Sequence, residues 1–71
     1  MELIIACEQE DDGRWLAEIV ELPGVLAYGE SSDLAMVRVQ ALGLRVLADR
    51  LEHGETGPIN LLISLPLVEP V

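Results

Sequence analysis

Cysteine and histidine are almost absent from this chain, which has one of each among its 71 residues. A single cysteine, Cys7, cannot close a disulfide within the chain, and a single histidine, His53, cannot supply a Cys/His set with zinc spacing. Chains below roughly 70 to 80 residues usually need disulfides, a metal or oligomerisation to support a small core. The sequence therefore predicts one domain, residues 1–71, without a metal or cofactor, that gains stability by forming a homo-oligomer.

Basic residues and aromatic residues are also scarce. Lysine and phenylalanine are missing, and four arginines oppose 13 acidic residues, which gives a formal net charge of −9. Such a charge repels phosphate backbones, and two aromatic residues, Trp15 and Tyr28, are too few for a base-stacking surface. We therefore expect no direct binding of nucleic acid, and a basic protein is the better match for this chain.

No apolar run is long enough to span a bilayer. The segment INLLISLPLV at residues 59–68 is interrupted by Pro66 and falls far short of the roughly 20 residues that a transmembrane helix needs. The N-terminus carries Glu2 where a secretory signal would carry positive charge. We expect a cytoplasmic protein without membrane association, in which residues 59–65 form a buried strand.

Two strands are predicted at the N-terminus by the alternation of apolar and polar residues. They span about residues 2–9 and 14–22, and Asp12-Gly13 between them favours a two-residue type I′ hairpin turn, which needs positive φ at both positions. We expect Trp15, the largest apolar side chain, to anchor the core. The predicted inward face of the two strands consists of Leu3, Ile5, Cys7, Trp15, Ala17 and Ile19.

Turn and cap residues mark the remaining elements. Pro23-Gly24 favours a type II turn, and a short strand follows at about residues 25–29. Ser31 or Ser32 can cap a helix over about residues 32–53, which Gly54 can end in the left-handed conformation. In the last strand, at about 59–65, the residues on one face are Ile59, Leu61, Ile63 and Leu65. The order βββαβ predicts an α+β fold in which one helix packs on one face of a small sheet.

The predicted helix has more apolar surface than one sheet face can cover. One stripe consists of Ala35, Val39, Leu42 and Val46, and a second stripe consists of Val37, Ala41, Leu44, Ala48 and Leu51. Large exposed apolar patches are unusual on monomeric proteins, so the second stripe is our candidate oligomer interface. The alternative is that the C-terminal residues, Leu67 to Val71, wrap around the helix.

Residues that could carry chemistry have structural interpretations. The carboxylates around the first hairpin match no EF-hand spacing and are typical of a solvated turn. His53 is explained by the helix dipole, and Cys7 by a small hydrophobic position in a strand. Nuclease chemistry would need metal-binding carboxylates on the strands, whose inward faces here are apolar. We therefore predict no catalytic residue and no enzyme activity.

Residues 12–35, DGRWLAEIVELPGVLAYGESSDLA, resemble the HicB-like antitoxin family, whose members read roughly DGGYxAEVPELPGCxxxGDTxEEA. The hairpin turn, Ala17-Glu18, the ELPG segment, Gly29 and the start of the helix fall in register, and the likeness covers about residues 10–50. The resemblance implies a partial ribonuclease-H-like fold whose last strand lies parallel beside the first.

The resemblance also implies a function. Domains of this family are not enzymes; they bind and block HicA, a small basic ribonuclease toxin, and usually carry a separate DNA-binding segment at the C-terminus. The sequence reaches only Val71, so we expect a stand-alone domain without that segment. The acidic residues Glu18, Glu21 and Glu30 are candidates for the rim of a partner interface.

Several positions depart from the family pattern. Val20 and Val25 replace a usual proline and a common cysteine, and Leu34 replaces the acid that would complete a capping box with Ser31. The second helix stripe occupies positions that are usually polar, which favours self-association. The alternative to an antitoxin is an orphan oligomeric regulator, or a ligand-binding module, that has no toxin partner.

Overall fold

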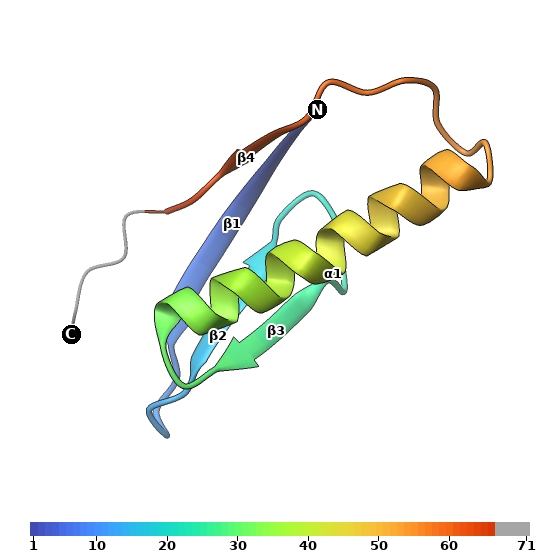
Figure 1. Cartoon of the computed structure of the whole chain (residues 1–71). Helices are drawn as coiled ribbons and strands as arrows, with labels where there is room; N and C mark the ends of the chain where they lie inside the picture. Colours follow the sequence, from blue (N-terminus) through green and yellow to red (C-terminus); the bar gives the residue numbers. More distant parts are fainter. Residues whose placement is uncertain (67–71) are drawn as a thin grey trace.

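The computed structural model describes residues 1–66 as a four-stranded sheet with one long helix across it (Figure 1). The elements are β1 (Glu2–Gln9), β2 (Trp15–Ile19), β3 (Leu26–Gly29), α1 (Ser32–Glu52) and β4 (Leu62–Ser64). The strand order is β3-β2-β1-β4, with antiparallel β1–β2 and β2–β3 pairs and a parallel β1–β4 pair. The predicted α+β class, the βββαβ order and the parallel placement of the last strand beside the first are confirmed.

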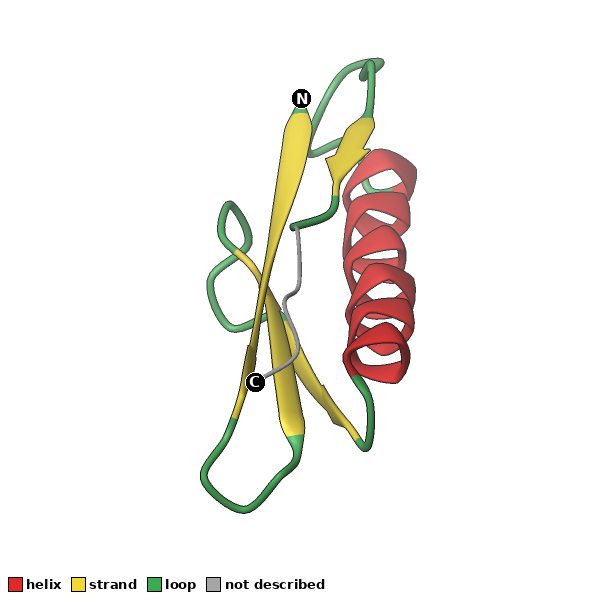
Figure 2. Ribbon diagram, turned by 90° about the vertical axis from the view of Figure 1, so that its left-hand side faces the viewer, coloured by secondary structure: helices red, strands yellow, loops and turns green. Residues whose placement is uncertain are grey.

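The core lies between α1 and one face of the sheet (Figure 2). Alternation in β1 and β2 turns Leu3, Ile5, Ala17 and Ile19 toward the helix, as the sequence predicts. The complete set of buried apolar residues is Leu3, Ile5, Ala17, Ile19, Leu22, Val25, Ala35, Met36, Val39 and Leu47. Cys7 and Trp15 are half-buried and pack against this set.

Trp15 is not the central core anchor that we expected. It is the first residue of β2 and pairs with Gln9 and Gly29, so it lies at the end of the sheet beside the hairpin. The largest fully buried side chains are instead Leu3, Ile5 and Val39.

The first hairpin is in the predicted place but has a different turn. Gly13 has φ +93°, whereas no residue other than glycine has positive φ in the described chain, so Asp12 does not take the type I′ conformation. The Gly13 N–H donates to the Glu10 carbonyl at 3.0 Å, and the Glu10 N–H donates to the Arg14 carbonyl at 2.7 Å. These bonds form a three-residue loop with glycine in the left-handed position, which needs only one positive φ.

β2 is shorter than predicted because two turns follow it. The Leu22 N–H donates to the Ile19 carbonyl at 3.1 Å, and the Val25 N–H donates to the Leu22 carbonyl at 3.0 Å across Pro23-Gly24. Gly24 has φ +87°, as a type II turn requires at its third residue. β3 therefore begins at Leu26, close to the predicted start.

Both ends of α1 use the expected signals. The Ser31 hydroxyl accepts the Leu34 N–H at 3.1 Å, which makes Ser31 the N-cap. At the other end Gly54 has φ +69°. The Glu55 N–H donates to the Arg50 carbonyl at 2.9 Å and the Gly54 N–H to the Leu51 carbonyl at 3.3 Å, which together form a Schellman motif.

The buried face of α1 differs from the first predicted stripe. Ala35 and Val39 are buried, but Leu42 and Val46 are only half-buried, and Gly43 and Leu47 take the more central positions. A Cβ atom on Gly43 would collide with the Ile19 side chain. The missing side chain at Gly43 therefore leaves room for the Ile19 side chain against the helix.

β4 is an edge strand of three residues and not the longer buried strand that we expected. It pairs only with the start of β1, where Glu2 lies opposite Leu62, so residues before Leu62 have no strand to join. Ile59 and Ile63 pack against the core, whereas Leu61 and Leu65 are exposed. The alternative in which residues 67–71 wrap around the helix lies outside the described residues. Within the described residues no helix is both long and apolar enough to cross a bilayer.

Candidate protein-binding surfaces

The sheet has a second face, opposite α1, that no described element covers (Figure 2). Side chains that alternate with the core residues point to this side. We call this side of the sheet the outer sheet face, and its apolar members are Ile4, Leu16, Val20, Leu26, Tyr28 and Leu62. Val20 and Leu62 are 58% and 60% exposed, and among the six only Leu16 is half-buried. The fold thus leaves an apolar surface on β1 to β4 in contact with water.

Carboxylates lie within the outer sheet face. Glu18 is exposed in the middle of the sheet, between Ala6 of β1 and Leu26 of β3. A shallow hollow of about 150 Å³ opens on the same face. It is lined by Ala6, Cys7, Glu8, Leu16 and Glu18. A hollow lined by Ala6 and Leu16 together with two carboxylates suits a long cationic side chain, which can place its methylene stem against the apolar residues and keep its charge near oxygen.

The three predicted rim residues do not lie together. Glu18 belongs to the outer sheet face, and Glu30 is exposed between β3 and α1, at the hairpin end of the sheet. Glu21 lies at the opposite end, where its Oε1 accepts the Ile4 N–H at 2.7 Å. Because the Val20 N–H donates to the Ile4 carbonyl, the Glu21 carboxylate continues the β1–β2 ladder past the end of β2. Glu21 therefore has a structural role.

The second helix stripe is on the side of α1 that faces away from the sheet. We call Val37, Ala41, Leu44, Ala48 and Leu51 the outer helix stripe. Val37 is 62% exposed, Leu44 and Leu51 are each 43% exposed, Ala48 is exposed and Ala41 is half-buried. The five positions are spaced alternately by four and three residues, which is the spacing of the apolar seam between paired helices.

The two surfaces differ in electrostatic setting. α1 contains three arginines, Arg38, Arg45 and Arg50, and three acidic residues, so the helix carries no net charge. The formal charge of −9 therefore belongs to the sheet, the loops and the C-terminal residues. The Arg38 guanidinium already makes a hydrogen bond within the chain, because its Nη1 donates to the Tyr28 carbonyl at 2.8 Å. Repulsion between two copies would be weakest across the helix.

Among the hairpin carboxylates, Asp12 acts within the turn. Asp12 accepts the Arg14 backbone N–H at 3.0 Å and the Arg14 Nε–H at 2.7 Å. These hydrogen bonds lower the pKa of the Asp12 carboxyl from its ordinary value. The Arg14 guanidinium also lies over the Tyr28 ring, 4.5 Å from its centroid, so it links the hairpin to the edge of the outer sheet face.

Two side chains that could take part in catalysis, Cys7 and His53, have structural roles in this fold. Burial, with a smaller contribution from Glu8, raises the pKa of the Cys7 thiol, which favours the unreactive neutral form. His53 is exposed at the C-cap of α1, with Nδ1 2.7 Å from the Asp49 carbonyl oxygen. No polar or charged side chain among residues 1–66 is buried, so the described residues contain no enclosed polar site.

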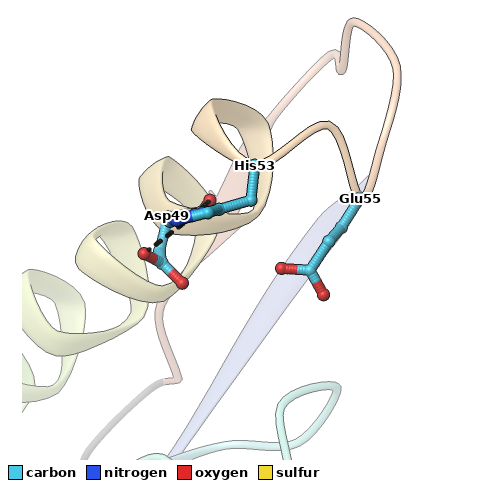
Figure 3. Close-up of side chains that lie close together, drawn as sticks. All are labelled: Asp49, His53 and Glu55. Atoms are coloured by element: carbon cyan, nitrogen blue, oxygen red, sulfur yellow. Dashed lines mark hydrogen bonds and ion pairs between the residues drawn. The ribbon is translucent and has the colours of Figure 1, made fainter.

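One set of side chains in the described residues could hold a metal ion. Asp49, His53 and Glu55 converge at the C-terminal end of α1 (Figure 3). We expected no metal site because the chain has one histidine, and spacing along a single helix does not reveal Glu55, which reaches the set only through the turn after the helix. The alternation of residues in the sequence predicts that Ile4, Leu16 and Val20 lie on the outer sheet face. It does not predict how far along the strands this face stays uncovered by the described residues.

Comparisons of this chain with protein-family models, with curated proteins and with solved structures returned no match.

Proposed function

We propose that this chain is a non-catalytic protein-binding domain of the HicB-like kind, and that it neutralises a small basic ribonuclease of the HicA type. The proposal rests on the outer sheet face, an apolar surface with carboxylates within it that no element among residues 1–66 covers. Such a surface suits a partner with apolar and cationic side chains. The residues of the ELPG segment and the helix start, on which the family resemblance rests, support the same function.

The proposed binding site centres on Glu18. A lysine or arginine of the partner would enter the hollow between Glu8 and Glu18, and apolar partner residues would cover Val20 and Leu26 beside it. The apolar contact would supply most of the affinity, whereas the acidic charge would speed the encounter and select a basic partner. Glu21 would support this surface through its bond to β1 and would not contact the partner.

The ribonuclease-H-like relationship of the fold is part of the proposal, and nuclease activity of this chain is not. Nucleases of that kind use carboxylates on the strands to hold metal ions. Here the side chains that β1 and β2 direct toward α1 include no carboxylate: Leu3, Ile5, Ala17 and Ile19 are buried there, and Cys7 and Trp15 pack beside them. The blocking of a nuclease by surface contact needs no reactive group on this chain.

The outer helix stripe favours an oligomeric protein, and this also supports the alternative of an oligomeric regulator without a toxin. We propose that two copies pair through α1, because this helix is neutral and its exposed apolar residues have the spacing of a helix–helix seam. Self-association through α1 would leave both outer sheet faces free. One assembly could then bind a partner on each copy.

The function is tested by capture of a partner and assay of its activity. The purified chain is used as bait in a lysate of the organism that encodes it, and small basic proteins that are retained are purified and assayed for RNA cleavage. We expect a retained ribonuclease that an equimolar amount of this chain inhibits. A retained protein that cleaves no RNA, or a ribonuclease that stays active in the complex, would favour the regulator alternative over the antitoxin.

A further inference from the structure

The end of α1 brings together three side chains that can each donate one ligand atom to a metal ion (Figure 3). Asp49 and His53 are one helical turn apart, so they lie on the same side of the helix. Glu55 follows the helix and turns its carboxylate back toward them. The ligand atoms of the three side chains all lie within 4.8 Å of one another, and all three residues are exposed.

The backbone fixes the position of Glu55 relative to the helix. Gly54 has φ +69°, which reverses the chain, and the Glu55 N–H donates to the Arg50 carbonyl at 2.9 Å. The Schellman motif therefore holds the Cα atom of Glu55 against the last turn of α1. The approach of the three side chains depends on this motif as well as on the flexible ends of the side chains.

The distances suit coordination with small movements. Nδ1 of His53 lies 3.2 Å from Oδ1 of Asp49. Two neighbouring ligand atoms that are each about 2.0 to 2.2 Å from one metal ion are separated by about 3 Å, so this pair needs almost no change. The ligand atoms of the set lie within 4.8 Å of one another, so the Glu55 carboxylate must approach by up to about 1.8 Å, which an exposed side chain can do by rotation. The hydrogen bond from His53 to the Asp49 carbonyl would be given up.

The electrostatic setting favours a cation. Carbonyl groups at the C-terminal end of a helix carry partial negative charge, and Asp49 and Glu55 add two carboxylates. Arg50 and Glu55 both line a second hollow beside Leu47 and Ile59, so the Arg50 guanidinium brings positive charge near the set. The net charge of −9 acts in the opposite sense, because it raises the concentration of cations around the whole chain.

We propose that Asp49, His53 and Glu55 form a binding site for a first-row divalent transition metal ion such as Zn²⁺, Ni²⁺ or Cu²⁺. The imidazole nitrogen selects these ions over Mg²⁺ and Ca²⁺, which prefer oxygen ligands alone. Three protein ligands leave a fourth position for water or for a group from another molecule. A bound ion would join the last turn of α1 to the segment before β4 and so protect the end of the helix from fraying. The site is independent of the outer sheet face and of the proposed function.

The site is tested by calorimetric titration of the untagged chain with Zn²⁺, and with Mg²⁺ as the comparison ion. We expect one Zn²⁺ per chain, and an affinity that falls by about ten-fold or more in His53→Asn and in Glu55→Gln, each of which removes one ligand. The matched control is Glu52→Gln, which removes a carboxylate from the same helical turn but not from the set. This variant should bind Zn²⁺ as the wild type does.

The location is tested by backbone amide NMR signals during the same titration. We expect the shifts that saturate at one equivalent to be confined to residues near 49–56. Absence of stoichiometric Zn²⁺ binding to the wild type would overturn the proposal. Equal binding by His53→Asn, or shifts centred on the hairpin carboxylates at residues 8–12, would overturn it as well, because the ligands would then be elsewhere.

Discussion

At the scale of single residues, Gly29 is the position where the sheet and the helix approach most closely through their backbones. It is the last residue of β3 and is buried against the first turn of α1. A Cβ atom on Gly29 would lie 2.5 Å from the Ala35 nitrogen and 3.0 Å from the Ala35 Cα atom. Both are backbone atoms, so no side-chain rotation can relieve the contact.

We predict that Gly29→Ala destabilises the protein by about 1 to 3 kcal/mol, because the start of α1 must move away from β3. The matched control is Gly57→Ala, where a Cβ atom would meet nothing within 4 Å and φ is not positive. Urea unfolding followed by circular dichroism measures both changes. Equal stability of the two variants would show that the contact at Gly29 is looser than described.

The thiol of Cys7 provides a second test at this scale. Burial raises its pKa above the ordinary value of 9.0, so the thiolate is a small fraction of the population at pH 7 to 8. We predict that the folded chain reacts with a disulfide reagent more slowly than the same chain unfolded in urea. The rate should rise as the pH approaches and passes 9. A folded chain that reacts as fast as the unfolded one would contradict the half-buried setting.

At the scale of elements, α1 depends on its N-cap. Ser31 satisfies the Leu34 N–H, whereas Ser32 is already the first helical residue. We predict that Ser31→Ala lowers the free energy of unfolding by about 1 kcal/mol, the usual effect of losing such a cap. Ser32→Ala is the matched control and should be nearly neutral. Thermal unfolding of the two variants measures both changes in stability. A larger loss of stability in Ser32→Ala than in Ser31→Ala would mean that Ser32 is the N-cap.

The elements that the sequence predicts well are those with local signals. The alternation of β1 and β2, Pro23-Gly24, the serine cap and Gly54 each act within a few residues, and each is found where predicted. Features that depend on distant partners were missed or wrong. The extent of β4 is set by where β1 begins, 60 residues away at Glu2 opposite Leu62. The central place of Gly43 depends on the Ile19 side chain across the core.

The same division applies to the candidate sites. The outer helix stripe was predicted because it lies on one helix with a regular period. The hollow around Glu18 needs the pairing of two strands, β1 and β2, and the set of Asp49, His53 and Glu55 needs a particular turn. The first hairpin shows that a local signal can be wrong in detail. Asp12-Gly13 permits a two-residue turn, but the hydrogen bond from the Glu10 N–H to the Arg14 carbonyl closes a three-residue loop instead.

At the scale of the whole molecule, the fold presents two apolar surfaces on opposite sides. We predict that the wild-type chain self-associates to a mass above its monomer mass of 7.7 kDa, and that Leu44→Glu in the outer helix stripe reduces the mass toward that of the monomer. Val20→Glu introduces the same side chain on the outer sheet face and should leave self-association unchanged. Light scattering with size-exclusion chromatography measures the masses. If Val20→Glu alone dissociates the assembly, the copies pair through the sheet.

The central claim is that the outer sheet face binds a basic protein through Glu18 and its apolar neighbours. Its most direct test is the dissociation constant of the captured basic protein with the wild type, Glu18→Lys and Leu44→Glu. We expect Glu18→Lys to weaken binding by about ten-fold or more, since a like charge would face the partner's cation, and the wild-type association rate to fall with added salt. Leu44→Glu should retain wild-type affinity. Unchanged affinity in Glu18→Lys together with lost binding in Leu44→Glu would place the partner on the helix and contradict the claim.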